Sequence, residues 1–206
     1  IQEARSAYPD APVFALWHTI RTHAPWAVDR EGVPIYPARL PVVEGARMVG
    51  SDKAGKYSTP ELQSIERRLY AASAIDFDRQ LGELVAELKA DGTYDETMIV
   101  VTADHGATIP ITADRRYGDT LSERWSEVAH VPLMVKAAGQ QTPEVVTAVR
   151  STGQIAQSVM DTAGATPGAD LTLSPDLSKD LPSPPVFSTV AGGVMTPWVY
   201  SGVKEV

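Results

Sequence analysis

The 206-residue sequence contains no cysteine, which excludes disulfides, thiolate metal sites and a cysteine nucleophile within the chain. It also lacks an apolar run near the roughly 20 residues that a membrane-spanning helix needs. Basic residues are scarce, with 18 Lys and Arg against 26 Asp and Glu and a net charge of −8. Because nucleic-acid phosphates require a basic surface, no nucleic-acid partner is expected. An anionic small substrate stays compatible, since a bound cation reverses the local field.

The remaining composition is that of an ordinary globular protein, with 43% hydrophobic and 21% charged residues. The length suits one domain, or one large piece of a bigger one. The first residue is Ile1, and the residues that follow it show no signal peptide. We therefore expect the chain to be a segment processed or excised from a longer protein.

The clearest predicted element is a long helix that begins near Ser58 and ends at Gly92. Ser58 or Thr59 can cap it, Pro60 suits its first turn, and Gly92 suits a left-handed C-terminal cap. Apolar residues recur at spacings of three and four, as an amphipathic helix requires: Leu62, Ile65, Leu69, Ala72, Ile75, Leu81, Leu84, Val85 and Leu88. The β-branched run at 97–102 that follows is typical of a central parallel strand.

Later segments carry further patterns. The sequence predicts a strand at Val131–Lys136, a partly helical stretch within 143–164 and a loop or linker over 165–185. Two short terminal strands are expected near 185–190 and 194–203. Strands that alternate with helices indicate an α/β fold.

Asp104, His105 and Gly106 directly follow the predicted strand at 97–102, and ligands of open α/β sheets bind beyond the carboxyl ends of strands. A carboxylate beside an imidazole is a donor pair suited to Ca, Mg, Mn or Zn. Gly106 lets backbone or substrate approach closely. The alternative is a polar turn at the strand end, in which the aspartate caps and the histidine lies on the surface.

Two other features could handle an anion. His23 follows an apolar run, Val13–Ile20, that is typical of a buried strand, and it could donate to an anionic substrate or protonate a leaving oxygen. The alternative is that His23 is an ordinary histidine of a surface loop, without a role in chemistry. Arg115 and Arg116 could clamp an anion through their planar paired donors, or form ordinary solvated surface charge.

Taken together, these segments resemble the sulfatase family of the alkaline-phosphatase superfamily. The resemblance covers about residues 12–165 and is looser over 165–206. The motifs resemble most those of membrane-anchored sulfatase-like proteins of actinobacteria. The motifs that carry it are, in order, His23–Trp26, Tyr70–Asp78, Gly82–Leu84, Gly92–Thr97, Ile99–Gly106 and His130–Lys136.

The resemblance implies a three-layer α/β/α sandwich that is incomplete at its N-terminus, with residues 1–206 as the C-terminal portion of one domain. The family's metal-binding Asp and His correspond to Asp104 and His105, and its sulfuryl- or phosphoryl-contacting His corresponds to His23. Arg115 and Arg116 stand in the loop where classical sulfatases carry a lysine. The implied cofactor is a divalent metal ion, with calcium first and manganese, magnesium or zinc as alternatives.

The implied function is a metal-dependent sulfuric ester hydrolase that acts on a sulfate- or phosphate-ester substrate. The family's nucleophile and first acidic metal ligands would lie upstream of Ile1, so we expect this chain alone to bind metal weakly and to turn over nothing. A phosphoglycerol or phosphoethanolamine transferase of the same superfamily and a non-catalytic envelope-binding module are the alternatives. The resemblance also implies an extracytoplasmic parent protein, anchored in the membrane, and exposed strand edges would favour self-association of the fragment.

Overall fold

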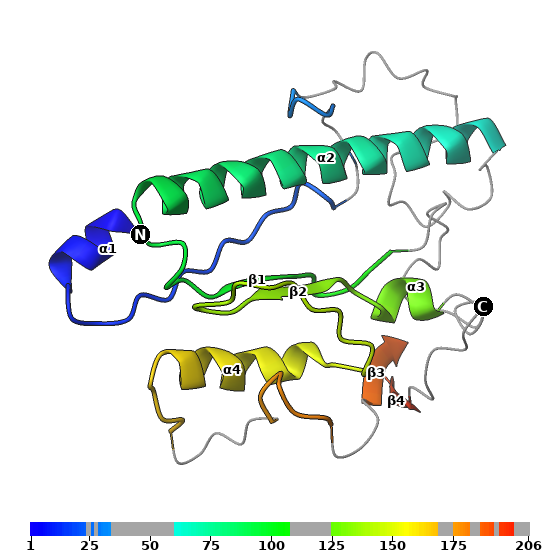
Figure 1. Ribbon diagram of the computed structural model, residues 1–206. Helices are drawn as coiled ribbons and strands as arrows, with labels where there is room; N and C mark the ends of the chain where they lie inside the picture. The colour runs from blue at the N-terminus through cyan, green and yellow to red at the C-terminus, as the bar shows by residue number, and fades with distance from the viewer. Residues whose placement is uncertain are drawn as a thin grey trace.

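The computed structural model describes residues 1–23, 26, 29–33, 60–107, 125–168, 175–181, 186–191 and 194–199. Figure 1 shows how the elements of these segments are arranged. The helices are α1 (Gln2–Ala7), α2 (Pro60–Ala90), α3 (Trp125–Ala129) and α4 (Ile155–Thr162), the last preceded by the 3-10 turn η4 (Thr152–Gln154). The strands are β1 (Ile99–Thr102), β2 (Leu133–Lys136), β3 (Val186–Ala191) and β4 (Val194–Val199).

Helix α2 confirms the long helix expected from apolar spacing. It runs over 31 residues from Pro60, while the capping residues Ser58 and Thr59 lie outside the described residues. Its C-terminal end is a left-handed glycine cap, because Gly92 has a φ of 71° and its N–H donates to the Lys89 carbonyl at 3.1 Å. The cap turns the chain from α2 toward β1.

Strands β1 and β2 occur where the sequence predicts strands, but the parallel arrangement expected for β1 is wrong. The two strands pair antiparallel, with Ile99 opposite Lys136 and Thr102 opposite Leu133. The expectation rested on the apolar, β-branched composition of β1, which reflects burial on both faces. Composition does not encode direction, and in the structure most of β1 is only partly buried.

The strand expected at Val13–Ile20 is also wrong, because the described chain is irregular there. Several apolar side chains of this stretch are largely exposed, at 70% for Phe14, 81% for Leu16 and 73% for Ile20. A strand forms only where a neighbour supplies hydrogen-bond partners along its length, and the β1–β2 sheet of the described residues has two strands only. An apolar run therefore adopts irregular structure here.

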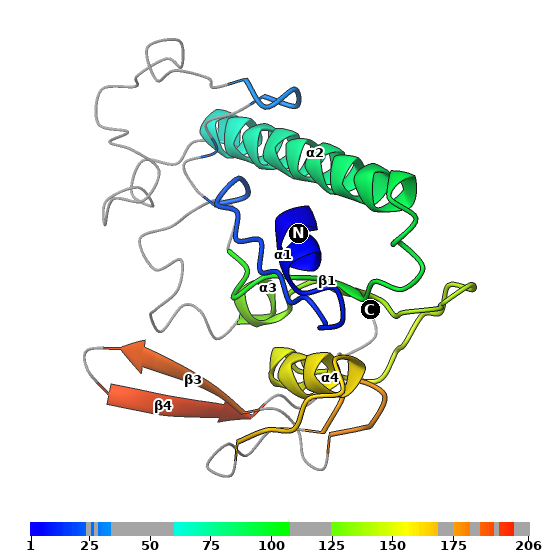
Figure 2. The same ribbon diagram turned by 90° about the vertical axis from the view of Figure 1, so that its left-hand side faces the viewer.

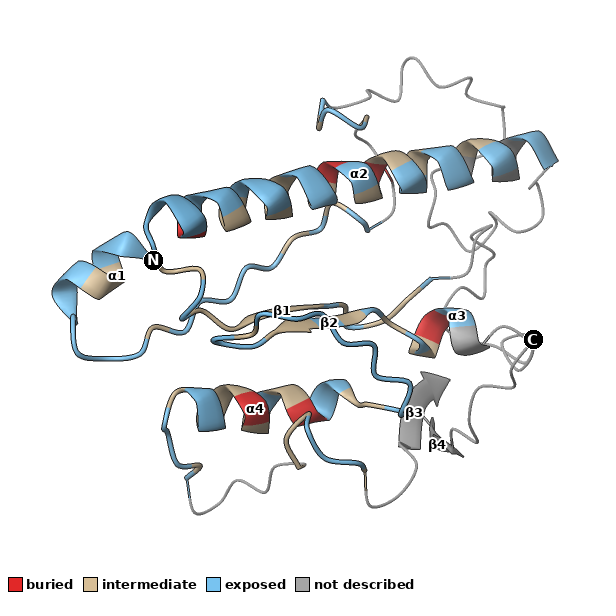
Figure 3. Ribbon diagram, in the orientation of Figure 1, coloured by how far each residue is buried: buried red, intermediate tan, exposed pale blue. Residues whose placement is uncertain are grey.

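The described elements are layered. In both Figure 1 and Figure 2 the β1–β2 pair lies between α2 on one side and α4 on the other. Most of α2 is exposed or half-buried, as Figure 3 shows, and Ser73, Asp76 and Leu88 are buried among those of its residues whose burial is described. Among the described residues, no helix combines the length and apolar character that crossing a bilayer demands.

The C-terminal third contains the remaining expected elements. Helix α4 confirms the partly helical stretch within 143–164. Strands β3 and β4 confirm the two terminal strands, and they pair antiparallel with Val186 opposite Val199.

Residues 175–181, part of the expected loop or linker, dock on η4 and α4. The fully buried Gln154 amide donates to the carbonyls of Asp176 at 3.0 Å and Lys179 at 2.9 Å. The Ser158 hydroxyl accepts from the Leu177 N–H at 2.7 Å. Because these buried polar groups are satisfied by one another, the segment is an ordered loop.

Asp176 makes this docked loop sensitive to acid. Its carboxylate is paired with the Lys179 ammonium at 2.8 Å, and this contact, with help from the hydroxyl and N–H of Ser178, holds the pKa of Asp176 far below its ordinary value near 3.8. A carboxyl whose pKa is depressed by folding stabilises the folded state above its unfolded pKa, and this contribution is lost as the pH falls through the folded pKa.

We therefore expect the free energy of unfolding to decline as the pH drops below about 4, and Asp176→Asn to flatten that decline. Urea unfolding followed by circular dichroism between pH 2 and pH 7 measures both curves. Asp10→Asn is the matched control, because it makes the same chemical change at an exposed aspartate outside the docked loop. Parallel curves for wild type and Asp176→Asn would contradict this account.

Candidate metal and anion site

The structure brings Asp104 and His105 together just beyond the end of β1. The His105 Nε2 lies 3.6 Å from Asp104 Oδ2, and the His105 backbone N–H donates to Asp104 Oδ1 at 2.9 Å. The Asp104 side chain is 86% exposed and that of His105 is 30% exposed. One carboxylate oxygen is therefore held by the backbone, while the other faces the imidazole.

A hydrogen bond of Nδ1, the second ring nitrogen, sets the orientation of the His105 ring. Nδ1 lies 2.7 Å from the Gly106 carbonyl oxygen. A carbonyl only accepts, so Nδ1 carries a proton in this contact, and Nε2 is the ring nitrogen that faces Asp104. Histidine ligands of metals commonly donate their other N–H to a backbone carbonyl in this way.

Gly106 places this pair directly against helix α3. Its N–H donates to the Val128 carbonyl at 2.7 Å, and a Cβ on Gly106 would lie 2.0 Å from the Glu127 carbonyl oxygen. Because a backbone carbonyl cannot retreat as a flexible side chain can, only glycine fits at this position. The close backbone approach expected for Gly106 is thus present.

The donors of Asp104 and His105 fit part of a divalent metal site. Metal–ligand distances of about 2.0–2.6 Å allow one ion to reach two donors that lie 3.6 Å apart. Within the described ranges, however, no group of three or more His, Asp or Glu residues is arranged to hold a metal ion. A metal ion at this pair would need further ligands, because calcium takes six to eight oxygens and zinc takes four ligands.

His23 lies in an exposed loop whose shape is set by neighbouring residues. Its N–H donates to the Ile20 carbonyl at 2.9 Å, which closes a turn. Trp26, only 3% exposed, donates through Nε1 to the Thr22 carbonyl at 3.0 Å and packs edge-on against Tyr70 of α2. In the described part of the chain His23 completes no three-residue metal cluster with the Asp104–His105 pair.

The other predicted anion-binding residues, Arg115 and Arg116, lie outside the described residues.

A shallow hollow of about 500 Å³ lies between α2 and the turn at 29–33 and is lined by Arg30, Glu31, Ile75, Asp78 and Arg79. None of the residues expected to handle metal or substrate lines it.

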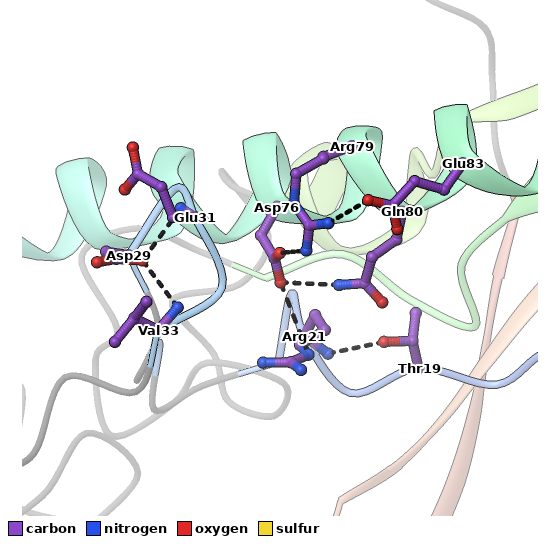
Figure 4. Close-up of polar contacts among 9 residues, drawn as sticks. All are labelled: Thr19, Arg21, Asp29, Glu31, Val33, Asp76, Arg79, Gln80 and Glu83. Carbon is purple, nitrogen blue, oxygen red and sulfur yellow. Dashed lines mark hydrogen bonds and ion pairs between the residues drawn. The ribbon is translucent and has the colours of Figure 1, made fainter.

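Sequence reasoning missed Asp76, a fully buried charged residue of α2. Its side chain has no exposed surface and contacts Arg79, Gln80 and Arg21, as Figure 4 shows. The available signal was a carboxylate one residue beyond Ile75, inside the apolar spacing of the helix. A charge at such a position needs partners, because burying it alone is costly.

Comparisons with known proteins agree on one family. The family model described as Sulfatase matches residues 2–165. Arylsulfatase K of Bos taurus is 30% identical over 110 residues, which are 53% of this chain and 19% of that protein. The endo-4-O-sulfatase of Bacteroides thetaiotaomicron is 29% identical over 97 residues, 47% of this chain and 18% of that protein. This chain thus spans about a fifth of the length of the curated relatives it matches. No solved structure matches it.

The close contact between Gly106 and α3 leaves no room for a side chain at this position. Gly106→Ala should push the loop that carries Asp104 and His105 away from α3 and lower the free energy of unfolding by about 1–3 kcal/mol, the usual range for overpacking. Urea unfolding measures the change. The matched control is Gly82→Ala within α2, where a Cβ meets nothing within 4 Å and alanine should stabilise the helix by about 0.8–1 kcal/mol. Equal stabilities for Gly106→Ala and wild type would refute the packing argument.

Proposed function

The chain belongs to the sulfatase family, and from this premise we propose that it supplies part of the metal and anion site of an enzyme that hydrolyses sulfate esters. The observation that carries the proposal is the Asp104–His105 pair at the end of β1, with its two donors 3.6 Å apart. Membership in the family implies an α/β fold. The position of β1 and β2 between α2 and α4 supports the finer proposal of a three-layer α/β/α sandwich.

We assign residues 1–206 to the C-terminal portion of one sulfatase-like domain. Two features support this assignment: the chain covers about a fifth of its curated relatives, and Asp104 and His105 contribute only two donors to a site that needs four or more. The nucleophile and the further ligands would come from another part of the protein. On this basis the 206-residue chain alone binds metal weakly and has no turnover.

The proposed chemistry divides among residues of this chain. Asp104 and His105 would hold a divalent ion, with calcium first and manganese, magnesium or zinc as alternatives, and such an ion neutralises charge on the ester oxygens. The Gly106 carbonyl fixes the His105 tautomer, so that Nε2 stays available as a ligand. His23 would donate a hydrogen bond to the transferring group or a proton to the leaving oxygen. Arg115 and Arg116 would add paired donors for the anion.

Three attributes of the whole protein complete the proposal. Its site would act on an ester of sulfate in preference to phosphate, as the names of its relatives suggest. The resemblance to anchored actinobacterial proteins supports an extracytoplasmic location in the cell envelope, with a membrane anchor outside this chain. The exposed apolar side chains of Phe14, Leu16 and Ile20 support self-association of the isolated chain.

Metal binding is the first test. In calorimetry with Ca²⁺ on the full-length protein, Asp104→Ala should weaken binding at least tenfold, because it removes a charged ligand. Asp10→Ala is the control, since it removes an exposed aspartate from a turn near the N-terminus and should bind Ca²⁺ as wild type does. Equal affinities of wild type and Asp104→Ala would remove Asp104 from the site.

Turnover is the second test. With an aryl sulfate as substrate and the full-length protein, His23→Ala should lower kcat by about 10²–10³, the range for loss of an acid or a transition-state donor. His18→Ala, five residues earlier and also exposed, is the control and should retain kcat. Release of phosphate or transfer to an alcohol acceptor, without cleavage of the sulfate ester, would favour the transferase alternative. An unchanged kcat in His23→Ala would exclude the role of His23.

A further inference from the structure

Asp76 uses both of its carboxylate oxygens. Oδ1 accepts from Arg79 Nη2 at 2.7 Å, and Oδ2 accepts from Gln80 Nε2 at 2.8 Å while lying 3.6 Å from Arg21 Nε. Arg79 and Gln80 follow Asp76 by three and four residues on the same helix, so α2 can supply these partners by itself. Arg21 comes from a distant stretch, and it is the contact that links the carboxylate to the rest of the fold.

Arg21 stands at the start of the turn that presents His23. The Arg21 N–H donates to Thr19 Oγ1 at 3.2 Å, and the His23 N–H donates to the Ile20 carbonyl at 2.9 Å. The guanidinium therefore ties the chain to Asp76 two residues before His23. Figure 4 shows Asp76 reaching from α2 toward Arg21, with Thr19 beside it.

The other side of the turn is tied to the same helix. Trp26 is buried against Tyr70, with the ring centroids 5.5 Å apart, and its Nε1 holds the Thr22 carbonyl at 3.0 Å. His23 thus lies between two attachments to α2, one ionic at Asp76 and one aromatic at Tyr70. Both attachments act on residues 20–23, the first at the Arg21 side chain and the second at the Thr22 carbonyl.

A second turn, Asp29–Val33, closes over the carboxylate. Asp29 Oδ1 accepts from the N–H groups of Glu31 at 3.0 Å and Val33 at 2.8 Å, and Gly32 adopts a φ of 77°. A Cβ on Gly32 would lie 2.5 Å from Asp76 Oδ1, so this backbone passes directly over the carboxylate. The turn helps to exclude water from Asp76, and exclusion of water strengthens the ionic contact to Arg21.

From this geometry we propose that Asp76 is a positioning residue for His23: its buried carboxylate, through Arg21, holds the backbone of residues 20–23 in the orientation in which His23 meets the sulfuryl group. The inference rests on the proposed function, because it assigns a role to the loop that carries His23. In this role Asp76 acts through Arg21 and makes no direct contact with substrate or metal. Its effect passes through the backbone of the loop.

The test uses histidine ring signals in NMR, because the chain contains only four histidines, which single substitutions can assign. In Asp76→Asn the ring signals of His23 should shift or broaden while those of His105 and His130 remain in place. Hydrogen exchange of the His23 N–H, which is bonded to Ile20, should accelerate about tenfold as the loop opens more often. Asp78→Asn makes the same chemical change at an exposed residue of α2 and should leave both readouts at their wild-type values.

A second variant keeps the test decisive if Asp76→Asn does not fold. Arg21→Met removes the link to the loop but leaves Arg79 and Gln80 on the carboxylate, and Arg21 is 40% exposed, so folding should survive. The same local change at His23 is expected. Wild-type signals and exchange at His23 in a folded variant would overturn the proposal, as would equal disturbance of all four histidines.

Kinetics of the full-length protein separate this inference from the proposed function. Asp76→Asn should lower kcat for the aryl sulfate at least tenfold with little change in KM, because binding survives while the alignment of His23 is lost. If His23→Ala retains kcat, the assigned role of His23 fails, and the NMR result still decides whether Asp76 holds the loop. If His23→Ala lowers kcat but Asp76→Asn changes neither NMR nor kcat, the positioning role alone is refuted.

Discussion

A carboxylate without exposed surface holds the N-terminal segment of the described chain on helix α2. Asp76 has its charge balanced by Arg79 within the helix and by Arg21 from the loop, and the raised pKa of Arg79 is due first to its hydrogen bond with Asp76. Aromatic contacts attach the same segment to α2, since Trp17 packs on Phe77 and the buried Trp26 packs on Tyr70. A polar anchor and aromatic packing therefore share the attachment of this segment to the helix.

The Asp104–His105 pair depends on a different constraint, the approach of two backbones. Gly106 lies so close to the Glu127 carbonyl that no side chain fits between β1 and α3, and the hydrogen bond to Val128 fixes the distance. The same residue offers its carbonyl to His105 Nδ1. One glycine thereby sets both the location of the loop and the tautomer of the histidine, which makes Asp104 and His105 a preorganised pair of donors.

The two halves of the candidate site are of unequal completeness. Asp104 and His105 lie side by side with donors 3.6 Å apart, whereas His23 lies on a loop whose residues Arg21 and Trp26 contact α2. The chain aligns with about a fifth of the length of its curated relatives. A site whose residues are far apart in the sequence is only partly contained in a segment of that length, which agrees with the incomplete set of donors described here. The match to the Sulfatase family model covers residues 2–165, the range that contains both parts of the candidate site.

The sequence by itself determined whatever depends on near neighbours in the chain. Apolar spacing and the Gly92 cap placed α2, β-branched runs placed β1, and adjacency ensured that Asp104 and His105 would lie together. Only the tertiary structure decided the antiparallel direction of β1, the exposed course of Val13–Ile20 and the burial of Asp76. Direction, exposure and burial are set by partners tens of residues away, and neither composition nor periodicity records which partner a segment meets.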